Sequence, residues 1–451
     1  MSHAMLQAWD RTVRHHGPER AVVQADNGTE LSFGELDASA TSWLATCGVD
    51  ARQLRGRPVL FAEPNGIGWL RIFLGLLKAG AVAVPLDATE PRAAQRHIAG
   101  ALRAAAWWNG TRLEPLARSR CYRDPSICLV KLTSGTTGRP QARVFTAGQL
   151  LADARQVTAT MGLGRRDLNY ALIPLGHSYG LGNLTVPLLA PGVPMVCGTA
   201  PLPHAIAADF ARWRPTVFPG VPAMWRALAA SPLRLDSLRL GISAGAPLPP
   251  EVARAFAARF GRRLHGFYGS SETGGIAYDR TGSATLAGGT GRALHGVKLT
   301  AASGARLLVA SAAVLTHGNR RRSGRLGAWL MPDRVELGPD GGVRLLGRRG
   351  TTVKLAGRRV NLREISDRLL HLPGVREAWV GINSGADPGL GAAVVTDRTP
   401  AELRAALLAA APAWKVPKIL VVLAALPLTT RGKTDTRALQ ALVFDRRGPK
   451  P

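Results

Sequence analysis

The chain is organised around Leu132-Thr133-Ser134-Gly135-Thr136-Thr137-Gly138-Arg139-Pro140, which follows a short apolar run, 127–130, typical of a buried strand. Four hydroxyl side chains and two glycines lie within residues 133–138. Glycine lets amide N–H groups approach an anion, and hydroxyls add further donors. The segment therefore suits a polyphosphate, although a flexible linker has a similar composition. It is not a Walker A loop, because Arg139-Pro140 stands where that motif ends in Gly-Lys-[Ser/Thr].

Length and charge limit the classes of protein to consider. At 451 residues the chain is too long for one hydrophobic core, so two or three domains are expected. The formal net charge is +28, carried mostly by scattered arginines, and the longest basic run is Arg320-Arg321-Arg322. We interpret this as a surface field that favours acidic partners and anionic substrates, with no nucleic-acid partner. A compositional replacement of lysine by arginine would give the same totals.

Cysteine spacing and hydropathy favour a cytoplasmic protein. No C-x-x-C spacing or nearby histidine pair accompanies the cysteines, which are Cys47, Cys121, Cys128 and Cys197. They are typical of thiols in a reducing compartment and not of disulfides or a zinc site. Residues 1–17 lack a signal-peptide core, and the most apolar window, 67–86, is interrupted by Arg71 and Lys78. We therefore expect no membrane insertion.

Strand-like and helix-like segments alternate along the first three hundred residues, which predicts a parallel α/β sheet. Ser32 and Glu35 have the spacing of a capping box at the start of one helix. The predicted strands are 21–25, 58–61, 81–86, 186–196 and 215–219, and the predicted helices include 69–78, 150–161 and 250–260.

The C-terminal third changes character. Residues 289–346 contain short strands separated by glycine turns, as in a small distorted barrel. Beyond 347–350 lies a unit of typical small-domain size, in which Asn361 is the predicted cap of a helix and Glu364 occupies the capping-box position. We predict an α/β fold with a large N-terminal domain, 1–347, and a small mobile α+β domain, 348–451.

Three more glycine-rich turns follow predicted strands, at 176–180, 244–247 and 268–275. Ligands of α/β proteins bind beyond the carboxyl ends of strands, so these turns and the 133–138 segment are expected to form the mouth of one site. His177 lies in the first turn, where a catalytic and a purely structural role are both open.

Six stretches, in order, resemble the motifs of the adenylate-forming superfamily, which includes acyl-CoA synthetases, aryl acid ligases and peptide-synthetase adenylation domains. They cover almost the whole chain and are 76–91, 132–140, 268–275, 288–297, 347–365 and 426–435. The sequences HSYGLGN, from His177, and YGSSETGGIA, from Tyr268, look most like bacterial aryl-polyene and hydroxybenzoate-type acyl ligases.

The resemblance implies an enzyme that uses ATP and Mg²⁺. It assigns Tyr268 to the adenine, Ser271 to the α-phosphate and Glu272 to Mg²⁺, which accepts one carboxylate together with phosphate oxygens. Lys433 would stabilise the charge that develops at the α-phosphate, and His177 joins Lys433 and Glu272 as an implied catalytic residue. The implied ATP-binding set is Thr133, Ser134, Gly135, Thr136, Thr137, Gly138, Gly245, Ala246, Tyr268, Gly269, Ser271, Asp333 and Arg348.

The resemblance also implies an acyl pocket and a thiol acceptor. The pocket residues would be His177, Tyr179, Gly180, Ala244, Gly245 and Gly275. Residues 176–180 lack the aspartate with which amino-acid adenylation domains hold a substrate amine, so an aryl or apolar acid is favoured. The acceptor would be CoA or the phosphopantetheine of an acyl carrier protein, reached through a tunnel at Lys354 and Gly357 after rotation about Gly350. The positive charge, with Arg358, Arg359 and Arg363 near the tunnel, favours an acidic carrier protein.

Several positions depart from the family pattern. Gln141-Ala142 replaces the usual Lys-Gly, Met331-Pro332 replaces Thr-Gly ahead of Asp333, and Gly350 stands at the hinge. An alternative reading is therefore a weakened homologue that binds ATP or acyl-AMP without forming a thioester. Retention of Glu272 and Lys433 favours a working enzyme.

Overall fold

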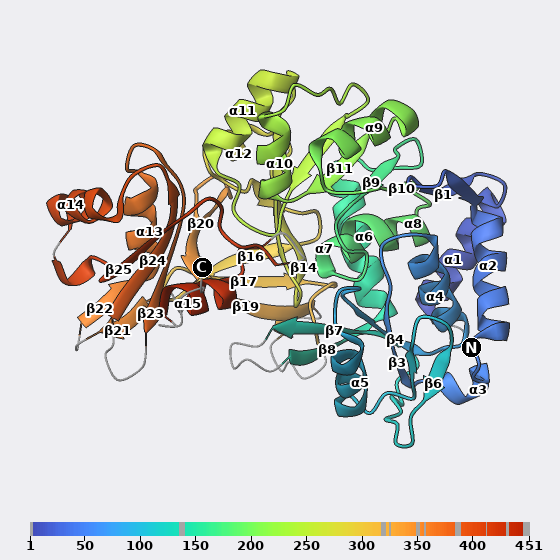
Figure 1. Cartoon of the computed structure of the whole chain (residues 1–451). Helices are drawn as coiled ribbons and strands as arrows, with labels where there is room; N and C mark the ends of the chain where they lie inside the picture. Colours follow the sequence, from blue (N-terminus) through green and yellow to red (C-terminus); the bar gives the residue numbers. More distant parts are fainter. Residues whose placement is uncertain are drawn as a thin grey trace. The chain divides into compact units, whose positions relative to one another are not determined.

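The computed structural model describes residues 3–134, 140–316, 322–323, 326–348, 352–355, 358–383, 389–411, 413–429 and 433–444. Figure 1 labels most of their helices and strands. Contacts within the chain divide it into two compact units. The first unit consists of Met1–Met331 with Val335–Leu345, and the second unit consists of Pro332–Arg334 with Leu346–Pro451.

A mixed sheet of nine strands runs through the first unit. The strands are β1 (Arg20–Gln24), β2 (Thr29–Ser32), β9 (Asn169–Ala171), β10 (Met195–Cys197), β11 (Val217–Gly220), β12 (Leu240–Ser243), β13 (Leu264–Ser270), β14 (Gly274–Tyr278) and β15 (Arg292–Ala293), in the order β15-β14-β13-β12-β11-β9-β10-β1-β2. The strands from β13 to β1 are parallel neighbours, and β2, β14 and β15 pair antiparallel at the two edges. The carboxyl ends of the parallel strands therefore share one edge of the sheet.

A second sheet has the order β6-β5-β3-β4-β7-β8. Its strands are β3 (Pro58–Ala62), β4 (Val82–Leu86), β5 (Ala106–Trp108), β6 (Leu113–Pro115), β7 (Ile127–Ser134) and β8 (Pro140–Thr146). Strands β5, β3, β4 and β7 are parallel, whereas β7 and β8 pair antiparallel on either side of residues 135–139. These two sheets confirm the α/β fold class.

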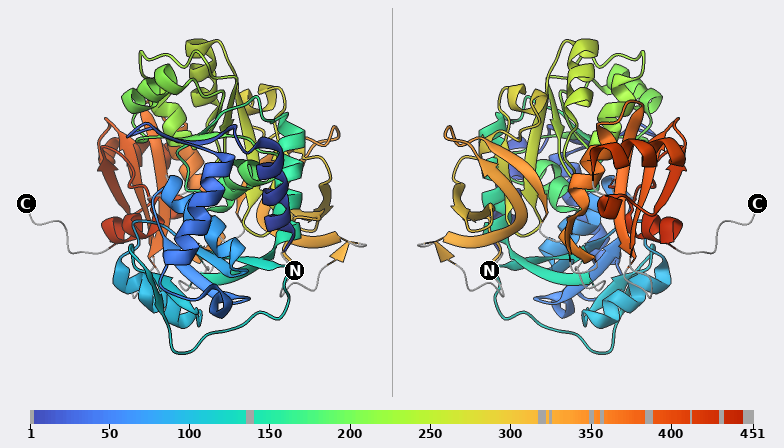
Figure 2. Two further views of the ribbon diagram at one scale, coloured as in Figure 1. Left: turned by 90° about the vertical axis from the view of Figure 1, so that its right-hand side faces the viewer. Right: turned by 90° about the vertical axis from the view of Figure 1, so that its left-hand side faces the viewer.

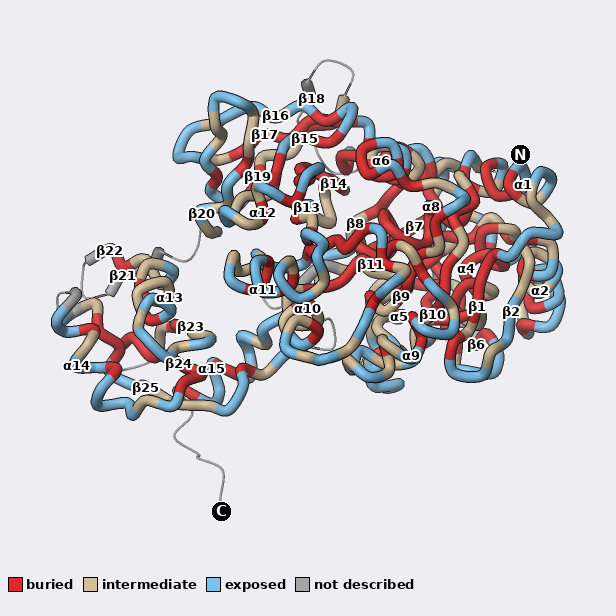
Figure 3. Tube along the Cα trace, turned by 90° about the horizontal axis from the view of Figure 1, so that it is seen from above, coloured by how far each residue is buried: buried red, intermediate tan, exposed pale blue. Residues whose placement is uncertain are grey.

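Helices cover both faces of these sheets because side chains alternate along each strand. Val217 packs into the core between the sheets, and its neighbour Phe218 packs under helices on the opposite face. Figure 3 shows the buried strands in red inside a more exposed shell. The helices are α1 (Ala4–His16), α2 (Phe33–Thr46), α3 (Ala51–Leu54), α4 (Ile67–Lys78), α5 (Arg92–Ala101), α6 (Ala147–Met161), α7 (Ser178–Gly180), the π-helix η1 (Leu181–Thr185), α8 (Val186–Leu189), α9 (Pro203–Trp213), α10 (Pro222–Ala229), α11 (Pro250–Phe260) and α12 (Ser283–Leu286).

A third sheet forms a half-barrel, in agreement with the small distorted barrel predicted for residues 289–346. Its strands curve strongly (Figure 2). They are β16 (Lys298–Ala302), β17 (Arg306–Ser311), β18 (Arg322–Ser323), β19 (Leu326–Leu337) and β20 (Val343–Arg348). The order is β16-β17-β19-β18, and β20 also pairs with β19.

Local sequence signals were reliable where side-chain chemistry identifies the element. Ser32 and Glu35 form the predicted capping box of α2. The strand predicted at 186–196 is wrong, because Val186–Leu189 is helical and only Met195–Cys197 forms a strand. Most of this segment is buried, so its apolar run carries no period that separates helix from strand.

The second unit is built on a three-stranded sheet. Its elements are β21 (Thr352–Leu355), β22 (Arg358–Asn361), α13 (Leu362–Leu370), β23 (Val375–Asn383), β24 (Gly389–Thr396), α14 (Pro400–Ala410), the 3₁₀ helix η2 (Ala413–Lys415), β25 (Ile419–Leu423) and α15 (Thr436–Phe444). Strand β24 lies between β23 and β25. On β24, Val394 packs in the core with α13 and α14, whereas Val395 packs in the core with α15. The sheet is therefore covered on both faces.

The sequence also leads us to expect free thiols and no membrane insertion. The four cysteines are free; Cys121 is exposed and the other three are buried. Among the described residues, no helix combines the length and the apolar content needed to cross a membrane.

Candidate active site

Three predicted turns lie at the shared carboxyl edge of the nine-stranded sheet. The first two follow β9 and β12, and the third, 268–275, contains the last residues of β13 and the start of β14. Strands β9, β12 and β13 belong to the parallel part of the sheet. Ala244 is buried after β12 and donates its amide to the carbonyl of Gly220 at 3.2 Å. Gly245 follows with φ +88°, a left-handed conformation that favours glycine. Ala246 comes next and is exposed.

Tyr179 anchors the first of these turns. Its hydroxyl donates to the carbonyl oxygen of Ile242 at 3.2 Å, with that of Gly220 at 3.4 Å. Its ring stacks on Phe267 at 5.8 Å between centroids. Burial raises the pKa of Tyr179 well above its ordinary value, so the hydroxyl stays protonated as a donor. Tyr179 therefore offers a fixed aromatic surface beside the carboxyl ends of β11 and β12.

His177 and Ser178 join this turn to the next one. His177 caps α7, and its Nδ1 accepts the amide of Tyr179 at 3.4 Å. Ser178 Oγ donates to Ser271 Oγ at 3.0 Å. The predicted acyl-pocket turn thus lies one hydrogen bond from the residue predicted to contact the α-phosphate.

The turn at 270–273 is tightly braced. Ser270 Oγ accepts the amides of Glu272 and Thr273, each at 3.2 Å. The carbonyl of Glu272 accepts the amide of Leu315 at 2.8 Å. These bonds fix the backbone of Glu272 from both sides of the turn.

The same turn is also held by the buried carboxylate of Asp153, a residue that the sequence did not suggest. Asp153, on α6, accepts the amide of Gly275 at 2.8 Å. Burial raises the pKa of Asp153, and the Gly275 amide and the Lys131 charge oppose that effect. Gly274 has φ +70°, and a Cβ placed there would lie 2.3 Å from Asp153 Oδ1. A single acidic residue inside a mostly apolar helix was the available signal.

Lys131, on β7, is a second residue that the sequence did not suggest. It is buried, and its Nζ lies 4.3 Å from the ring centroid of Phe145. Burial lowers the pKa of Lys131 to about 8, against the opposing charges of Asp153 and Glu272. The buried ammonium group of Lys131 therefore lies within the electrostatic influence of the carboxylates of Asp153 and Glu272.

Glu272 itself is partly exposed and faces a cation. Arg143 Nε, on β8, lies 3.6 Å from Glu272 Oε1, and the two side chains are 28% and 19% exposed. The described residues contain no cluster of three or more side chains able to hold a metal. One accessible carboxylate nevertheless fits Mg²⁺, which is usually bound by one or two carboxylates together with substrate phosphates.

The other predicted ATP-binding residues occupy varied positions. Tyr268 is buried on β13 and Gly269 follows it, while Asp333 is buried on β19. Thr133 and Ser134 are the last residues of β7, and Arg348 is the last residue of β20. Gly180 and Gly275, which were predicted for the acyl pocket, are buried, and Lys354, which was predicted for the tunnel, belongs to β21. The predicted positions outside the described residues are Gly135, Thr136, Thr137, Gly138, Gly350 and Gly357.

Lys433 lies in the second unit, in a short turn between β25 and α15. Its carbonyl accepts the amide of Thr429 at 2.7 Å, and its amide donates to Thr429 Oγ1 at 3.3 Å. Asp435 then caps α15 by accepting the amides of Arg437 and Ala438, each at 3.0 Å. The residue Lys433 is exposed, and its backbone is held by the two bonds to Thr429.

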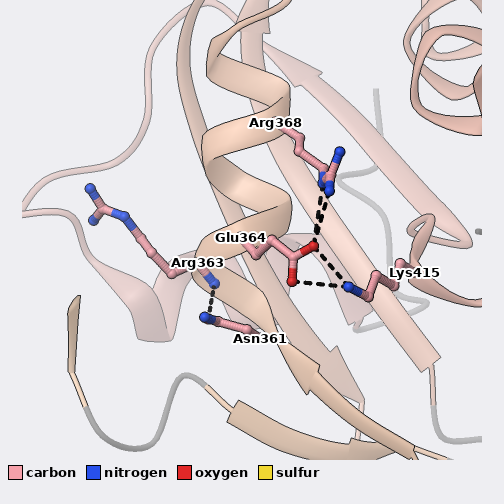
Figure 4. A network of polar contacts seen from close by, with 5 residues as sticks. All are labelled: Asn361, Arg363, Glu364, Arg368 and Lys415. Carbon is pink, nitrogen blue, oxygen red and sulfur yellow. Dashed lines mark hydrogen bonds and ion pairs between the residues drawn. The ribbon is translucent and has the colours of Figure 1, made fainter. Parts of the chain in front are cut away.

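Glu364 organises the polar face of α13 (Figure 4). Asn361 caps this helix as predicted, but Glu364 pairs with Lys415 at 2.8 Å and Arg368 at 3.2 Å instead of completing a capping box. These partners lower the pKa of Glu364, led by the hydrogen bond from Lys415. Arg363, one of the arginines predicted near the tunnel, pairs with Asp367 at 2.9 Å. That contact neutralises part of the positive charge expected there.

Comparisons with known proteins agree with this architecture. Residues 9–108 and 107–304 match the family model described as AMP-binding enzyme. A feruloyl-CoA synthase from Amycolatopsis is 27% identical over 318 residues, which cover 63% of this chain and 64% of the synthase. A probable non-canonical nonribosomal peptide synthetase of Salinispora arenicola is 28% identical over 96% of this chain and 6% of its own.

A solved structure extends the likeness to the whole fold. The ATP-bound MatB of Rhodopseudomonas palustris superimposes with a TM-score of 0.80. The match covers 96% of this chain and 98% of the other, at 21% sequence identity.

Proposed function

Because the chain belongs to the family of AMP-binding enzymes, we propose that it activates a carboxylic acid with ATP and passes the acyl group to a thiol. In the first step a carboxylate oxygen attacks the α-phosphorus, the bond to the bridging oxygen breaks, and acyl-AMP and pyrophosphate form. In the second step the thiol sulfur attacks the acyl carbon, its proton is lost to solvent, and AMP leaves.

The observation that carries this proposal is the 3.0 Å bond between Ser178 and Ser271 beside the braced turn of Glu272. It joins the turn proposed to hold the acid to the residue proposed to contact the α-phosphate. Proximity of this kind lowers the entropic cost of bringing two reactants together. Glu272 would hold Mg²⁺, which supplies neutralisation of phosphate charge, and Tyr268 would stack on the adenine.

We propose that Lys433 is the cation that stabilises the charge growing at the α-phosphate. A pre-oriented cation is effective there because it acts where charge develops in the transition state. Asp333 and Arg348 would bind the ribose, and the loop 133–138 would bind the β- and γ-phosphates.

We propose an aryl or apolar acid as the substrate. The stacked rings of Tyr179 and Phe267 and the buried Ala244 provide an apolar wall. The side chains of residues 176–180 provide no carboxylate that would hold a substrate amine. The feruloyl-CoA synthase relative is consistent with an aromatic acid.

The decisive experiment measures acid-dependent pyrophosphate release across a panel of aryl, fatty and amino acids. We expect release with aryl or apolar acids and none with amino acids, and loss of release in Glu272→Gln. Release only with amino acids would overturn the substrate class. ATP binding without release from any acid would favour the second candidate, a homologue that binds ATP or acyl-AMP without turnover. Gln141 in place of a lysine is the observation that favours that candidate.

We propose an acidic acyl carrier protein, rather than free CoA, as the thiol acceptor. The net charge of +28 would speed the encounter with an acidic partner, and salt screens such attraction over a Debye length of about 8 Å. Gly350 would be the hinge, and the segment from Lys354 to Gly357 would line the tunnel.

A thioesterification assay with both acceptors at rising salt tests this choice. The carrier protein should be preferred at low salt, and its apparent KM should climb steeply with salt while pyrophosphate release changes little. Efficient transfer to CoA with none to any acidic carrier protein would refute the proposed acceptor.

A further inference from the structure

The antiparallel hairpin of β7 and β8 places two cations side by side. Lys131 and Arg143 are paired directly across the hairpin. Residues opposite each other in an antiparallel pair project on the same face, and like charges in these positions are destabilising. Such a pair is stable only where anions compensate it, and Glu272 and Asp153 supply the negative charge.

The two cations differ in how they are held. Lys131 is buried against Phe145, within the fields of two carboxylates. Arg143 is 28% exposed, and its contact with Glu272, at 3.6 Å, is longer than a hydrogen bond. Within the part of the chain that the structure describes, the buried Nε of Arg143 has no hydrogen-bond partner. Arg143 is therefore the cation with unused bonding capacity.

The guanidinium of Arg143 is already oriented by its neighbours. Its Nη2 donates to Gln141 Oε1 at 2.7 Å, and its Cζ lies over the ring of Trp329, 5.5 Å from the centroid. Gln141 stands two residues nearer to the loop 133–138, on the same face of β8. A planar guanidinium held in this way presents a fork of donors suited to phosphate oxygens.

We propose that Arg143 is a phosphate-binding residue that exchanges Glu272 for the β- and γ-phosphates of ATP, and for pyrophosphate, when Glu272 binds Mg²⁺. Lys131 stays in place as the buried counter-charge that keeps Glu272 in position after Arg143 has left it. This inference rests on the proposed function. It also identifies a replacement for the cation whose absence at Gln141 favours the inactive alternative.

Equilibrium binding of inorganic pyrophosphate tests the exchange without requiring turnover. In Mg²⁺, Arg143→Gln should weaken binding about tenfold or more, as expected for a lost charge-assisted contact. Arg234→Gln is the matched control for net charge, because Arg234 is 83% exposed and pairs only with Asp236 among the described residues. It should change the affinity less than twofold.

A double-mutant cycle in EDTA tests the competition with Glu272. Glu272→Gln should tighten metal-free pyrophosphate binding, because it releases Arg143. The same substitution in an Arg143→Gln background should have about fivefold less effect, which is the coupling expected of side chains in contact. Thermal unfolding of each variant verifies that the fold is retained.

The outcomes separate this inference from the proposed function. Equal pyrophosphate affinities for the wild type and Arg143→Gln would overturn the role of Arg143, and so would strict additivity in the cycle. A wild type that binds neither ATP nor pyrophosphate would overturn both proposals. A wild type that binds pyrophosphate through Arg143 but releases none with any acid would remove the proposed function alone.

Discussion

The turn that carries Glu272 and the turn that carries Lys433 are built in opposite ways. The first is braced by Ser270, by the amide of Leu315 and by the buried carboxylate of Asp153. The second is closed mainly by bonds between Thr429 and Lys433, close neighbours in the chain. One depends on tertiary packing and the other on local geometry.

The two turns need different degrees of rigidity for their proposed roles. Glu272 is proposed to hold a metal, for which a small displacement changes the ligand geometry. Lys433 is proposed to stabilise developing charge in one of two half-reactions, so an exposed position held by local bonds is sufficient. Local opening should accordingly be easier at Lys433 than at Glu272.

Substitution of Lys433 should change activity more than any other substitution considered. Lys433→Ala should slow acyl-AMP formation by about two to three orders of magnitude while leaving ATP affinity nearly unchanged, because a transition-state donor is lost. Lys418→Ala, at another exposed lysine of the second unit, should be close to wild type. Unchanged adenylation in Lys433→Ala would refute the assigned role.

In the turn that carries Glu272, Gly274→Ala should disrupt the packing of the backbone against Asp153. The new methyl would meet Asp153 Oδ1 at 2.3 Å, and the residue would keep φ near +70°. We expect the free energy of unfolding to fall by about 3 kcal/mol. Gly304→Ala has a similar φ, +73°, but open space, so it should cost only about 1 kcal/mol. Equal costs in chemical denaturation would show that Asp153 does not restrict this position.

The pH dependence of stability tests the buried cation beneath Glu272. The pKa of Lys131 is lowered from 10.5 to about 8, chiefly by burial, with Asp153, Glu272, Cys128 and the opposite Arg143 around it. Between these two values the unfolded chain holds a proton that the folded protein has lost, so stability rises with pH. Relative to Lys131→Met, the free energy of unfolding of the wild type should gain about 2 kcal/mol between pH 8 and pH 9.5. Parallel curves for the two proteins would contradict the lowered pKa.

The smallest effect should come from the link between the turns. Ser178→Ala removes the hydroxyl that bonds Ser271, which costs about 1 kcal/mol and lowers kcat/KM for adenylation about fivefold. Thr199→Ala, at a hydroxyl that bonds Asp209 instead, serves as a control for general stability. An effect of Ser178→Ala no larger than that of the control would mean that the link does not position the acid.

Much of the fold could be predicted because residues close together in the sequence identify where a helix or a turn begins. The pair Ser32 and Glu35 marks a helix start through side-chain bonds to the backbone, and Gly245 marks a turn through its conformational freedom. Asp153, Lys131 and Arg143 could not be predicted in the same way. Each is a single residue whose role depends on a strand or helix distant in sequence, and no spacing reveals such a contact.

The failed prediction at Glu364 has a related cause. Its position fits a capping box, yet Lys415, fifty-one residues later, offers a charged partner at 2.8 Å. Lys415 Nζ donates to both oxygens of the carboxylate, whereas a capping box would give the same carboxylate one bond from an uncharged amide. Long-range pairing thus overrode a correct local rule.

Helices cover β24 on both faces, but they are not synthesised at the same time. Synthesis runs from the N-terminus, so the three strands, α13 and α14 emerge before α15. Until α15 docks, Ala393 and Val395 face water, and this side of the nascent sheet is a surface on which chaperones or other chains can act. The Lys433 turn leads directly into α15. Because the proposed catalytic lysine and α15 are both made last, newly made chains should become competent for adenylation only when the sheet is no longer exposed.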